Sequence, residues 1–235
     1  MEEFILDDLL NDIIAGKYET EEPLPSEPIL SQRYGVPRIV VRRAYYQLEE
    51  RGYVRSIKGK GRFLSRVRKH VLLPIGGGRS FTDKLHGSDA ALVTHNLGVK
   101  RVTPAAQVSA RFGLKASDHL REISLLRVID GEPAALHTTY VDQRRFPSIE
   151  AEGGSIDSLY AYFERYGHSR FEPRDVTLSV ALPTLEEQRT LLCGSLVPIL
   201  LSQYEIRSPD GILAYNKSIY RGDRFKYRFS TECAD

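Results

Sequence analysis

The chain has 235 residues, of which 41% are hydrophobic and 27% are charged, which suits one large folded domain or two small ones. It contains no apolar run of about 18 residues, and its acidic start lacks the basic region of a signal peptide, so we expect a cytoplasmic protein without a transmembrane helix. Cys193 and Cys233 form no CxxC pair and the six histidines form no HExxH motif, so we expect free thiols, no metal site and no cofactor.

Positive charge is concentrated in one part of the chain. The formal net charge is only +2, but residues 1–30 hold nine acidic residues and one lysine. Residues 31–69 hold twelve lysines and arginines, and subtracting their two glutamates leaves a charge of +10. Such a block is typical of a surface that binds a polyanion. The alternative is an ordinary solvated face, which the motifs of the same block disfavour.

Three helices are expected in the first 52 residues. Apolar residues recur every fourth position over Ile5–Ile13, which is the spacing of one helix face, and Gly16 follows as a stop. Ser26 stands at an N-cap position before a short second helix that Gly35 ends. Pro37 suits the first position of a third helix.

A hairpin is expected next, because two apolar segments flank the sequence KGKG. The segments are Tyr53–Ile57 and Arg62–Leu64. Three helices and a hairpin form a winged helix-turn-helix, so we expect a DNA-binding domain over residues 1–66. A linker, basic at first and then rich in glycine, is expected over residues 67–78.

Residues 79–235 mix strand and helix signals and predict a second domain, so that the fold class is α+β. Strands are expected over residues 120–129, 134–141, 176–182, 199–206, 212–220 and 225–229, the last three as a meander. Helices are expected from Thr103 to Gly113, from Ser155 to Tyr166, and from a capping box of Thr184 and Glu187 to Cys193.

The order and spacing of residues 4–65 resemble the GntR family of bacterial regulators. The matching residues are Ile14-Ala15-Gly16-Lys17-Tyr18, Leu24-Pro25-Ser26-Glu27, Gly35-Val36-Pro37-Arg38, Val41-Arg42-Arg43-Ala44, Leu48, Gly52 and Gly59-Lys60-Gly61-Arg62-Phe63. The resemblance implies a regulator that binds a double-stranded DNA operator. Because one short recognition helix is too small for a long site, we expect a homodimer on a two-fold symmetric operator. Pro37 and Val40 replace the family's usual Ser and Thr, which affects the operator sequence rather than binding itself.

The recognition helix is expected to enter the major groove by its N-terminal end, where Arg38 and Arg42 lie one turn apart. An arginine fork can bind guanine O6 and N7 together. The resemblance implies that both arginines contact DNA and that the KGKG tip approaches the minor groove and its phosphates. Arg33 and Arg43 are expected to contact phosphate or to stay solvated. The candidate DNA-binding residues are Arg33, Arg38, Arg42, Arg43, Lys58, Gly59, Lys60 and Gly61.

The C-terminal part resembles the UTRA domain, the effector-binding half of the HutC-type branch of that family. The matching stretches are Ser80-Phe81-Thr82, Arg127, Asp130-Gly131-Glu132-Pro133, Tyr140, Ser158-Leu159-Tyr160, Tyr166-Gly167, Asp210-Gly211 and Tyr220-Arg221-Gly222-Asp223-Arg224. The resemblance implies a chorismate-lyase-like antiparallel sheet with flanking helices, and a small anionic metabolite as effector. The candidate effector-binding residues are Ser80, Phe81, Thr82, Arg127, His137, Ser158, Tyr160 and Tyr220.

Arg127 and the helix start at Ser158 are expected to hold the anion's charge, with a hydrogen bond from Ser80. The alternatives are a surface charge for Arg127 and core packing for Tyr160 and Tyr220.

Leu125, His137 and Ala214 depart from the family pattern, in which an arginine and two glutamates stand. The exchange adds positive charge and removes acceptors for hydroxyl groups. We therefore expect an anion with few hydroxyls, such as a carboxylate, phosphonate, sulfonate or compact phosphate ester. The alternative is a conventional sugar-phosphate pocket that Leu125 and Ala214 merely repack.

Two other functions are compatible with parts of the pattern. A chorismate-lyase-like enzyme fused to a DNA-binding domain would need an acid–base pair, and His137 stands without an obvious carboxylate partner in the sequence pattern. A constitutive architectural DNA binder would not need the pocket residues. We therefore expect an effector-responsive regulator, acting as a repressor, and not an enzyme.

Overall fold

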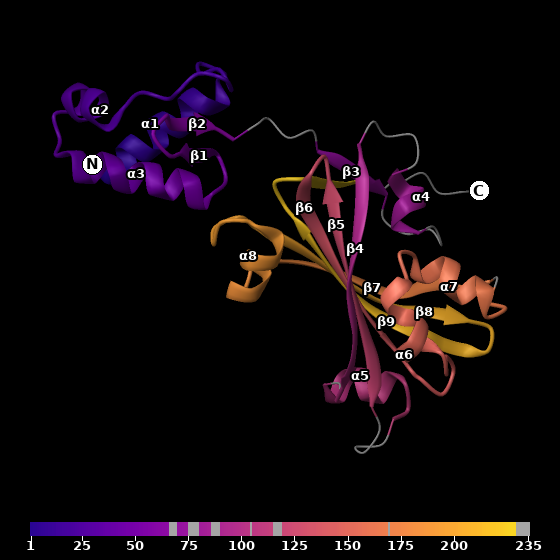
Figure 1. Cartoon of the computed structure of the whole chain (residues 1–235). Coiled ribbons are helices and arrows are strands. Elements are labelled where there is room, and N and C mark those ends of the chain that lie inside the picture. Colours follow the sequence, from indigo (N-terminus) through magenta and orange to yellow (C-terminus); the bar gives the residue numbers. More distant parts are fainter. Residues whose placement is uncertain are drawn as a thin grey trace, which may run out of the picture. The chain divides into compact units, whose positions relative to one another are not determined.

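The computed structural model describes residues 1–65, 70–74, 80–85, 90–103, 105–114, 119–168 and 170–228. The chain forms two compact units, Met1–Lys69 with Leu182–Pro198, and His70–Ala181 with Ile199–Asp235 (Figure 1). Cys233 and residues 67–69 and 75–78 of the expected linker lie outside the described residues. None of the helices in the described ranges is long and apolar enough to cross a membrane.

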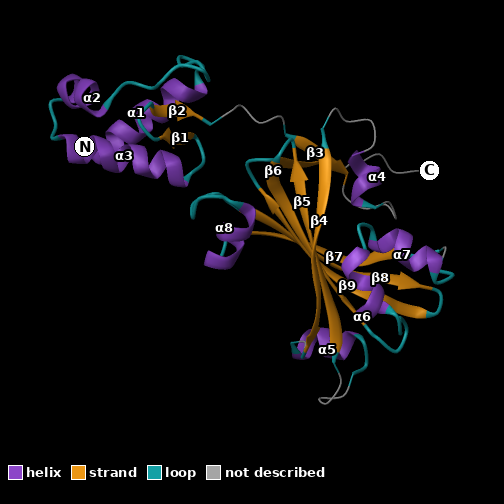
Figure 2. Ribbon diagram, viewed as in Figure 1, coloured by secondary structure: helices purple, strands orange, loops and turns teal. Residues whose placement is uncertain are grey.

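Three helices and a hairpin form the N-terminal part, as expected (Figure 2). Their bounds are α1 Glu2–Ile14, α2 Glu27–Tyr34, α3 Arg38–Glu50, β1 Val54–Ile57 and β2 Gly61–Leu64. Gly35 ends α2 in the left-handed conformation, with φ of 65°, which glycine adopts without steric cost. Pro37 occupies the N-cap position before α3, with an extended ψ of 146°, and not the first helical position that we expected.

The three helices pack around one apolar core. Ile5, Leu30, Ala44 and Leu48 are completely buried, and they come from all three helices. Tyr45 is buried beside them, and its hydroxyl donates a 2.5 Å hydrogen bond to the carbonyl oxygen of Pro25. This bond satisfies a buried polar group and ties α3 to the segment before α2.

The expected capping box at Thr184 is confirmed. The Glu187 amide donates to Thr184 Oγ1 over 3.3 Å, and the Thr184 amide donates to Glu187 Oε2 over 2.8 Å. The helix that they open, α8, spans Leu185–Leu191.

A six-stranded antiparallel sheet forms the second unit, with strand order β4-β5-β6-β9-β8-β7. The bounds are β4 Leu92–Val102, β5 Leu120–Ile129, β6 Glu132–Val141, β7 Glu172–Ala181, β8 Ile199–Ser208 and β9 Gly211–Arg221. The α+β class is therefore confirmed. We did not expect β4, whose pairing with β5 is interrupted by a shift in register between Asn96 and Val99.

The last strand does not continue the meander that the sequence predicted. Strand β10, Phe225–Arg228, pairs in parallel with β3, Val71–Pro74, to form a separate two-stranded sheet. The residues of β3 stand in the expected linker, so part of that segment forms a strand.

Short helices accompany the sheet. Their bounds are α4 Phe81–Leu85, α5 Ala106–Arg111, α6 Ile149–Glu152, a 3-10 turn Gly153–Ser155 and α7 Leu159–Arg165. Helix α7 begins later than expected, because Ser158 is its N-cap and the 3-10 turn precedes it.

Two apolar clusters make up the core of this unit. The larger one joins α7 to the sheet through Ile123, Phe146, Tyr162 and Phe163, all completely buried. The second cluster surrounds Phe81 and includes Ala135, Tyr220 and Phe225.

Strand β7 forms one edge of the sheet, and its apolar side chains are exposed. The sequence alternates apolar and polar residues here, and the strand forms as expected. Val176, Leu178 and Val180 nevertheless keep exposed fractions of 42%, 39% and 68%. An exposed apolar row on an edge strand is a ready surface for pairing with another chain.

Candidate DNA interface and ligand cavity

The candidate DNA-binding arginines project from α3 and its neighbours, and most are exposed. Arg38 opens α3, and among the described residues no carboxylate pairs with it. Arg43 lies 3.9 Å from a carboxylate oxygen of Glu2, at the limit of an ion pair. Arg33 contacts Tyr34 and Tyr18, and the hydrogen bond to Tyr34 raises its pKa. Arg38 is therefore the arginine that is most available to a polyanion.

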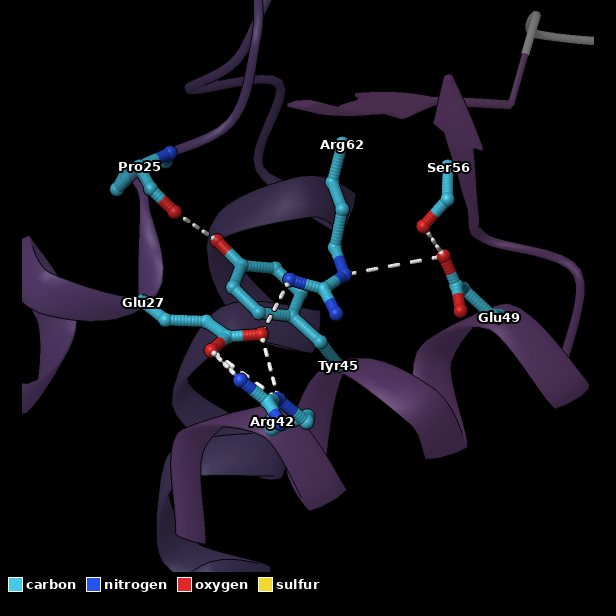
Figure 3. A network of polar contacts seen from close by, with 7 residues as sticks. All are labelled: Pro25, Glu27, Arg42, Tyr45, Glu49, Ser56 and Arg62. Carbon is cyan, nitrogen blue, oxygen red and sulfur yellow. Dashed lines mark hydrogen bonds and ion pairs between the residues drawn. The ribbon is translucent and has the colours of Figure 1, made fainter. Parts of the chain in front are cut away.

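Arg42 differs from these arginines because its guanidinium is held by Glu27. Nε lies 3.2 Å from each carboxylate oxygen, and Nη2 lies 3.0 Å from Oε2 (Figure 3). The sequence predicted a DNA contact for Arg42 but did not reveal this partner.

The hairpin tip carries exposed cations on a turn that glycine makes accessible. Gly59 and Gly61 adopt φ of 76° and 110°, which lie in the region that side chains rarely enter. Lys58 and Lys60 are exposed beside them. The tip therefore has the local structure that a minor-groove or phosphate contact requires, while the DNA contact itself stays a prediction.

The second unit contains a small cavity between the two apolar clusters of its core. Its volume is about 50 Å³. It is lined by Ser80, Phe81, Leu125, Arg127, His137, Thr139, Ser158, Leu159, Tyr160, Tyr204, Ile206, Asn216 and Tyr220. The structure thus brings together seven of the eight candidate effector-binding residues, from α4, β5, β6, β9 and the start of α7.

Arg127 is the cavity's buried charge, with only 4% of its surface exposed. Its Nη1 donates to Thr94 Oγ1 and, over 3.1 Å, to the carbonyl oxygen of Asp157. Its Nε is buried without a hydrogen-bond partner, and no carboxylate among the described residues pairs with it. Burial lowers the pKa of Arg127 to about 10, because desolvation disfavours the charged form. The alternative of an exposed strand charge is therefore wrong.

Aromatic rings surround the arginine. The Phe81 ring stands edge-on to His137 with centroids 4.7 Å apart, and the Arg127 guanidinium carbon lies 5.4 Å from the Phe81 centroid. Tyr160 and Tyr220 line the cavity, and burial raises the pKa of Tyr160 to about 12. The tyrosine hydroxyls therefore stay neutral and can donate hydrogen bonds at neutral pH.

Three candidate residues are placed differently from our expectation. The Ser158 hydroxyl accepts a 3.4 Å hydrogen bond from the Ala161 amide, so it caps its own short helix. The Ser80 hydroxyl donates to Asp83 Oδ2 over 2.6 Å at the start of α4. Thr82 does not line the cavity but an adjoining hollow. Arg127, rather than the helix end at Ser158, is thus the group with free capacity for an anion.

The sequence analysis missed several polar residues of the lining. Asn216 Nδ2 donates to Thr139 Oγ1 over 2.9 Å, and the Ser218 hydroxyl donates to Asn216 Oδ1 over 2.5 Å. Tyr204 stands on β8 and lines the same cavity. Ala214, which we expected in the pocket, packs instead in the larger apolar cluster. No local signal marks these positions, because strand pairing alone decides which side chains share a face.

An adjoining hollow of about 710 Å³ shares Ser80, Ser158 and Tyr160 with the cavity. Its rim carries three carboxylates, those of Asp83, Asp157 and Glu164, and none of the described residues that line it is Lys or Arg. The two spaces therefore differ in charge, with a buried cation inside and carboxylates outside.

Comparison with known families gives two matches that together span most of the chain. Residues 1–64 match the bacterial regulatory proteins of the gntR family, and residues 89–226 match the UTRA domain. Among the described residues, no group of three or more His, Cys, Asp or Glu side chains could hold a metal ion.

Several characterised proteins are similar over nearly the whole chain. The HTH-type transcriptional regulator TreR of Bacillus subtilis is 29% identical over 229 residues, covering 95% of this chain and 93% of TreR. The mannosyl-D-glycerate transport/metabolism system repressor MngR of Escherichia coli is 26% identical, covering 95% and 92%. The crystal structure of PhnF from Mycobacterium smegmatis has a TM-score of 0.64 at 21% identity, covering 97% of this chain and 99% of PhnF, which shows a shared fold.

The buried charge of Arg127, which no carboxylate among the described residues pairs with, predicts a stability change. Arg127→Met removes a desolvated cation that no carboxylate compensates while keeping the apolar stem, so we expect the free energy of unfolding to rise by about 1–4 kcal/mol. Arg174→Met is the control, because that arginine is 62% exposed and paired with Glu172, and should change stability by less than about 0.5 kcal/mol. Urea unfolding followed by circular dichroism measures both. A clear loss of stability in Arg127→Met would show that its hydrogen bonds outweigh the desolvation.

Proposed function

The chain belongs to the UTRA-domain regulators of the bacterial gntR family, and we propose that it is a cytoplasmic repressor that a small anion releases from its DNA operator. The observation that carries the proposal is the buried Arg127 guanidinium, which lines a small cavity and has no carboxylate partner among the described residues. We assign the chain to the HutC-type branch because it combines the gntR and UTRA domains.

Operator binding is proposed for the N-terminal domain, over residues 1–66. Arg38 at the exposed start of α3 supports base recognition in the major groove, and Lys58 and Lys60 at the hairpin tip support phosphate contacts. The charge of residues 31–69 supplies the attraction to DNA on which both depend.

A homodimer is proposed through the edge of the C-terminal sheet. A two-fold symmetric pair would pack the exposed face of β7 that carries Val176, Leu178 and Val180 against the same face of the second protomer, which takes these side chains out of water. The partner is a second copy of the chain, because a symmetric operator needs two recognition helices.

The effector is proposed to be a molecule with one anionic group and few hydroxyls. A volume of about 50 Å³ suits a single carboxylate, phosphonate, sulfonate or phosphate group rather than a whole metabolite. Arg127 and the neutral tyrosine hydroxyls would hold that group. Asn216 and Thr139 bond to one another and leave few acceptors for a sugar.

The remainder of the effector would occupy the adjoining hollow. Its rim carboxylates would repel a second anionic group, so a molecule charged at one end fits better than one charged at both. His137 would add a hydrogen-bond donor beside the anion, because its ring lines the same cavity.

The enzyme alternative has less support. The described residues that line the cavity include no Asp or Glu, so the lining itself offers no carboxylate for acid–base catalysis. The similar proteins TreR and MngR are a transcriptional regulator and a repressor.

Base recognition can be tested on α3. Arg38→Ala should weaken operator binding by about 1–3 kcal/mol per half-site and relax base preference, because it removes a bidentate contact. Lys58→Ala should weaken all DNA sequences alike and lower the salt dependence by about one charge. Selection from a library of random duplexes, followed by fluorescence anisotropy, separates the two effects. Unchanged selectivity in Arg38→Ala would overturn this docking of α3.

The dimer can be tested on β7. A Leu178→Glu, Val180→Glu double variant should shift the protein to monomers, because the carboxylates would be buried against each other in the pair. Thr177→Glu, on the opposite face of the same strand, is the control and should remain dimeric. Sedimentation equilibrium measures the mass, and a double variant that stays dimeric would exclude this interface.

The effector class can be tested by calorimetry with hydroxyl-poor anions and a hexosamine phosphate. We expect the hydroxyl-poor anions to bind more tightly, and His137→Ala to weaken their binding, since the ring would donate a hydrogen bond to the anion. Tight binding of the hexosamine phosphate that His137→Ala leaves unchanged would instead support the conventional sugar-phosphate pocket.

A further inference from the structure

The ion pair between Glu27 and Arg42 fixes the orientation of an arginine on the proposed recognition helix α3. We infer that Glu27 is a specificity-determining positioning residue, which orients the Arg42 guanidinium toward a base edge and withholds it from phosphate. The inference rests on the proposed binding of DNA by α3. Glu27 itself is placed on the first turn of α2 and needs no contact with DNA.

The ion pair with Glu27 leaves the edge of the Arg42 guanidinium that can bind a guanine base free. Glu27 engages Nε and Nη2 of Arg42 (Figure 3). A guanidinium has five N–H donors, so the edge formed by Nη1 and the second proton of Nη2 remains. That edge has the spacing that matches guanine O6 and N7.

Glu27 is itself held in place by the hairpin. Arg62, on β2, donates from Nη1 to Glu27 Oε1 over 2.9 Å. The carboxylate is only 16% exposed, and its two arginine partners, Arg42 first, hold its pKa below the usual range. One carboxylate thereby joins α2, α3 and β2.

Arg62 is fixed in turn by the core. Its guanidinium carbon lies 4.7 Å from the centroid of the buried Tyr45 ring, and its Nε lies 3.7 Å from Glu49 Oε1. Its backbone carbonyl accepts a 2.7 Å hydrogen bond from the Leu24 amide, close to Glu27 in the chain. The carboxylate that meets Arg42 is therefore a fixed point and not a mobile surface group.

The Glu27–Arg42 ion pair contributes little to the stability of the fold. Arg42 is 61% exposed, and exposed ion pairs contribute little to folding. The ion pair has a larger effect on DNA binding. An arginine whose charge is neutralised attracts phosphate weakly, while its fixed fork still matches one base pair. Arg38, which lacks such a partner among the described residues, would contact bases or phosphates without this restriction.

The test compares Glu27→Gln with Glu49→Gln. Glu27→Gln keeps the shape of the side chain but releases Arg42. Glu49→Gln removes a carboxylate near Arg62 and leaves Arg42 held, so it is the matched control. The probes are a library of random duplex DNA and a duplex of alternating deoxyadenosine and thymidine, which presents no guanine O6, with thermal unfolding as the check on folding.

We expect Glu27→Gln to bind the alternating duplex more tightly and to increase the salt slope by about 0.9, as one added phosphate contact requires. Selectivity at one base pair of each half-site should fall by about 5- to 100-fold. Glu49→Gln should match the wild type. In an Arg42→Ala background, Glu27→Gln should change neither quantity.

The outcomes separate this inference from the proposed function. If the wild type enriches no sequence, both are wrong. If it enriches an operator and Glu27→Gln selects the same bases with the same salt slope, the inference alone is overturned. Glu27→Asp is the second variant, for use if Glu27→Gln does not fold. The aspartate keeps the charge but reaches less far toward Arg42, so we expect a partial loss of base selectivity. Wild-type selectivity in Glu27→Asp would also contradict the inference.

Discussion

The buried guanidinium of Arg127 is the constraint on which the C-terminal domain depends. A cation taken out of water is costly unless an opposite charge or full hydrogen bonding compensates it. Among the described residues, Arg127 donates hydrogen bonds to Thr94 and to a backbone carbonyl oxygen, and the Phe81 ring lies beside it. Desolvation accordingly lowers its pKa. Any ligand that brings one negative charge into the cavity would recover part of that cost, which is why we propose that the small volume and the single cation form a site for one anionic group.

In the N-terminal domain, Arg42 has the opposite combination of exposure and pairing. Arg42 is exposed, yet a carboxylate neutralises and orients it, whereas Arg127 is buried and has no carboxylate. On the proposed function, the pairing of Arg42 lowers its general attraction to DNA in favour of selectivity, and the lack of a carboxylate beside Arg127 lowers stability in favour of anion binding. Both arrangements depend on neighbours far away in the sequence, namely Glu27 for Arg42 and the strands around β5 for Arg127.

Local signals explain what could be predicted from the sequence and what could not. The three N-terminal helices and the capping box at Thr184 follow from periodicity, caps and glycines, which act within a few residues. Strand β10 pairs with β3 more than 150 positions earlier, which no local pattern reveals. Arg127 and His137 were found through family resemblance, but Tyr204 and Asn216 reach the cavity only through the register of β8 and β9. The Glu27–Arg42 pair likewise follows from how α2 packs on α3.

The most direct test of the account is the affinity for the selected operator, measured by fluorescence anisotropy with and without the anion that binds most tightly in calorimetry. In the wild type, the anion should weaken operator binding by about 1–3 kcal/mol, and the operator should weaken anion binding by the same amount. In Arg127→Met, the same anion should leave operator affinity unchanged, which separates the effect from general salt screening. Equal operator affinity with and without bound anion in the wild type would contradict a repressor that an anion releases.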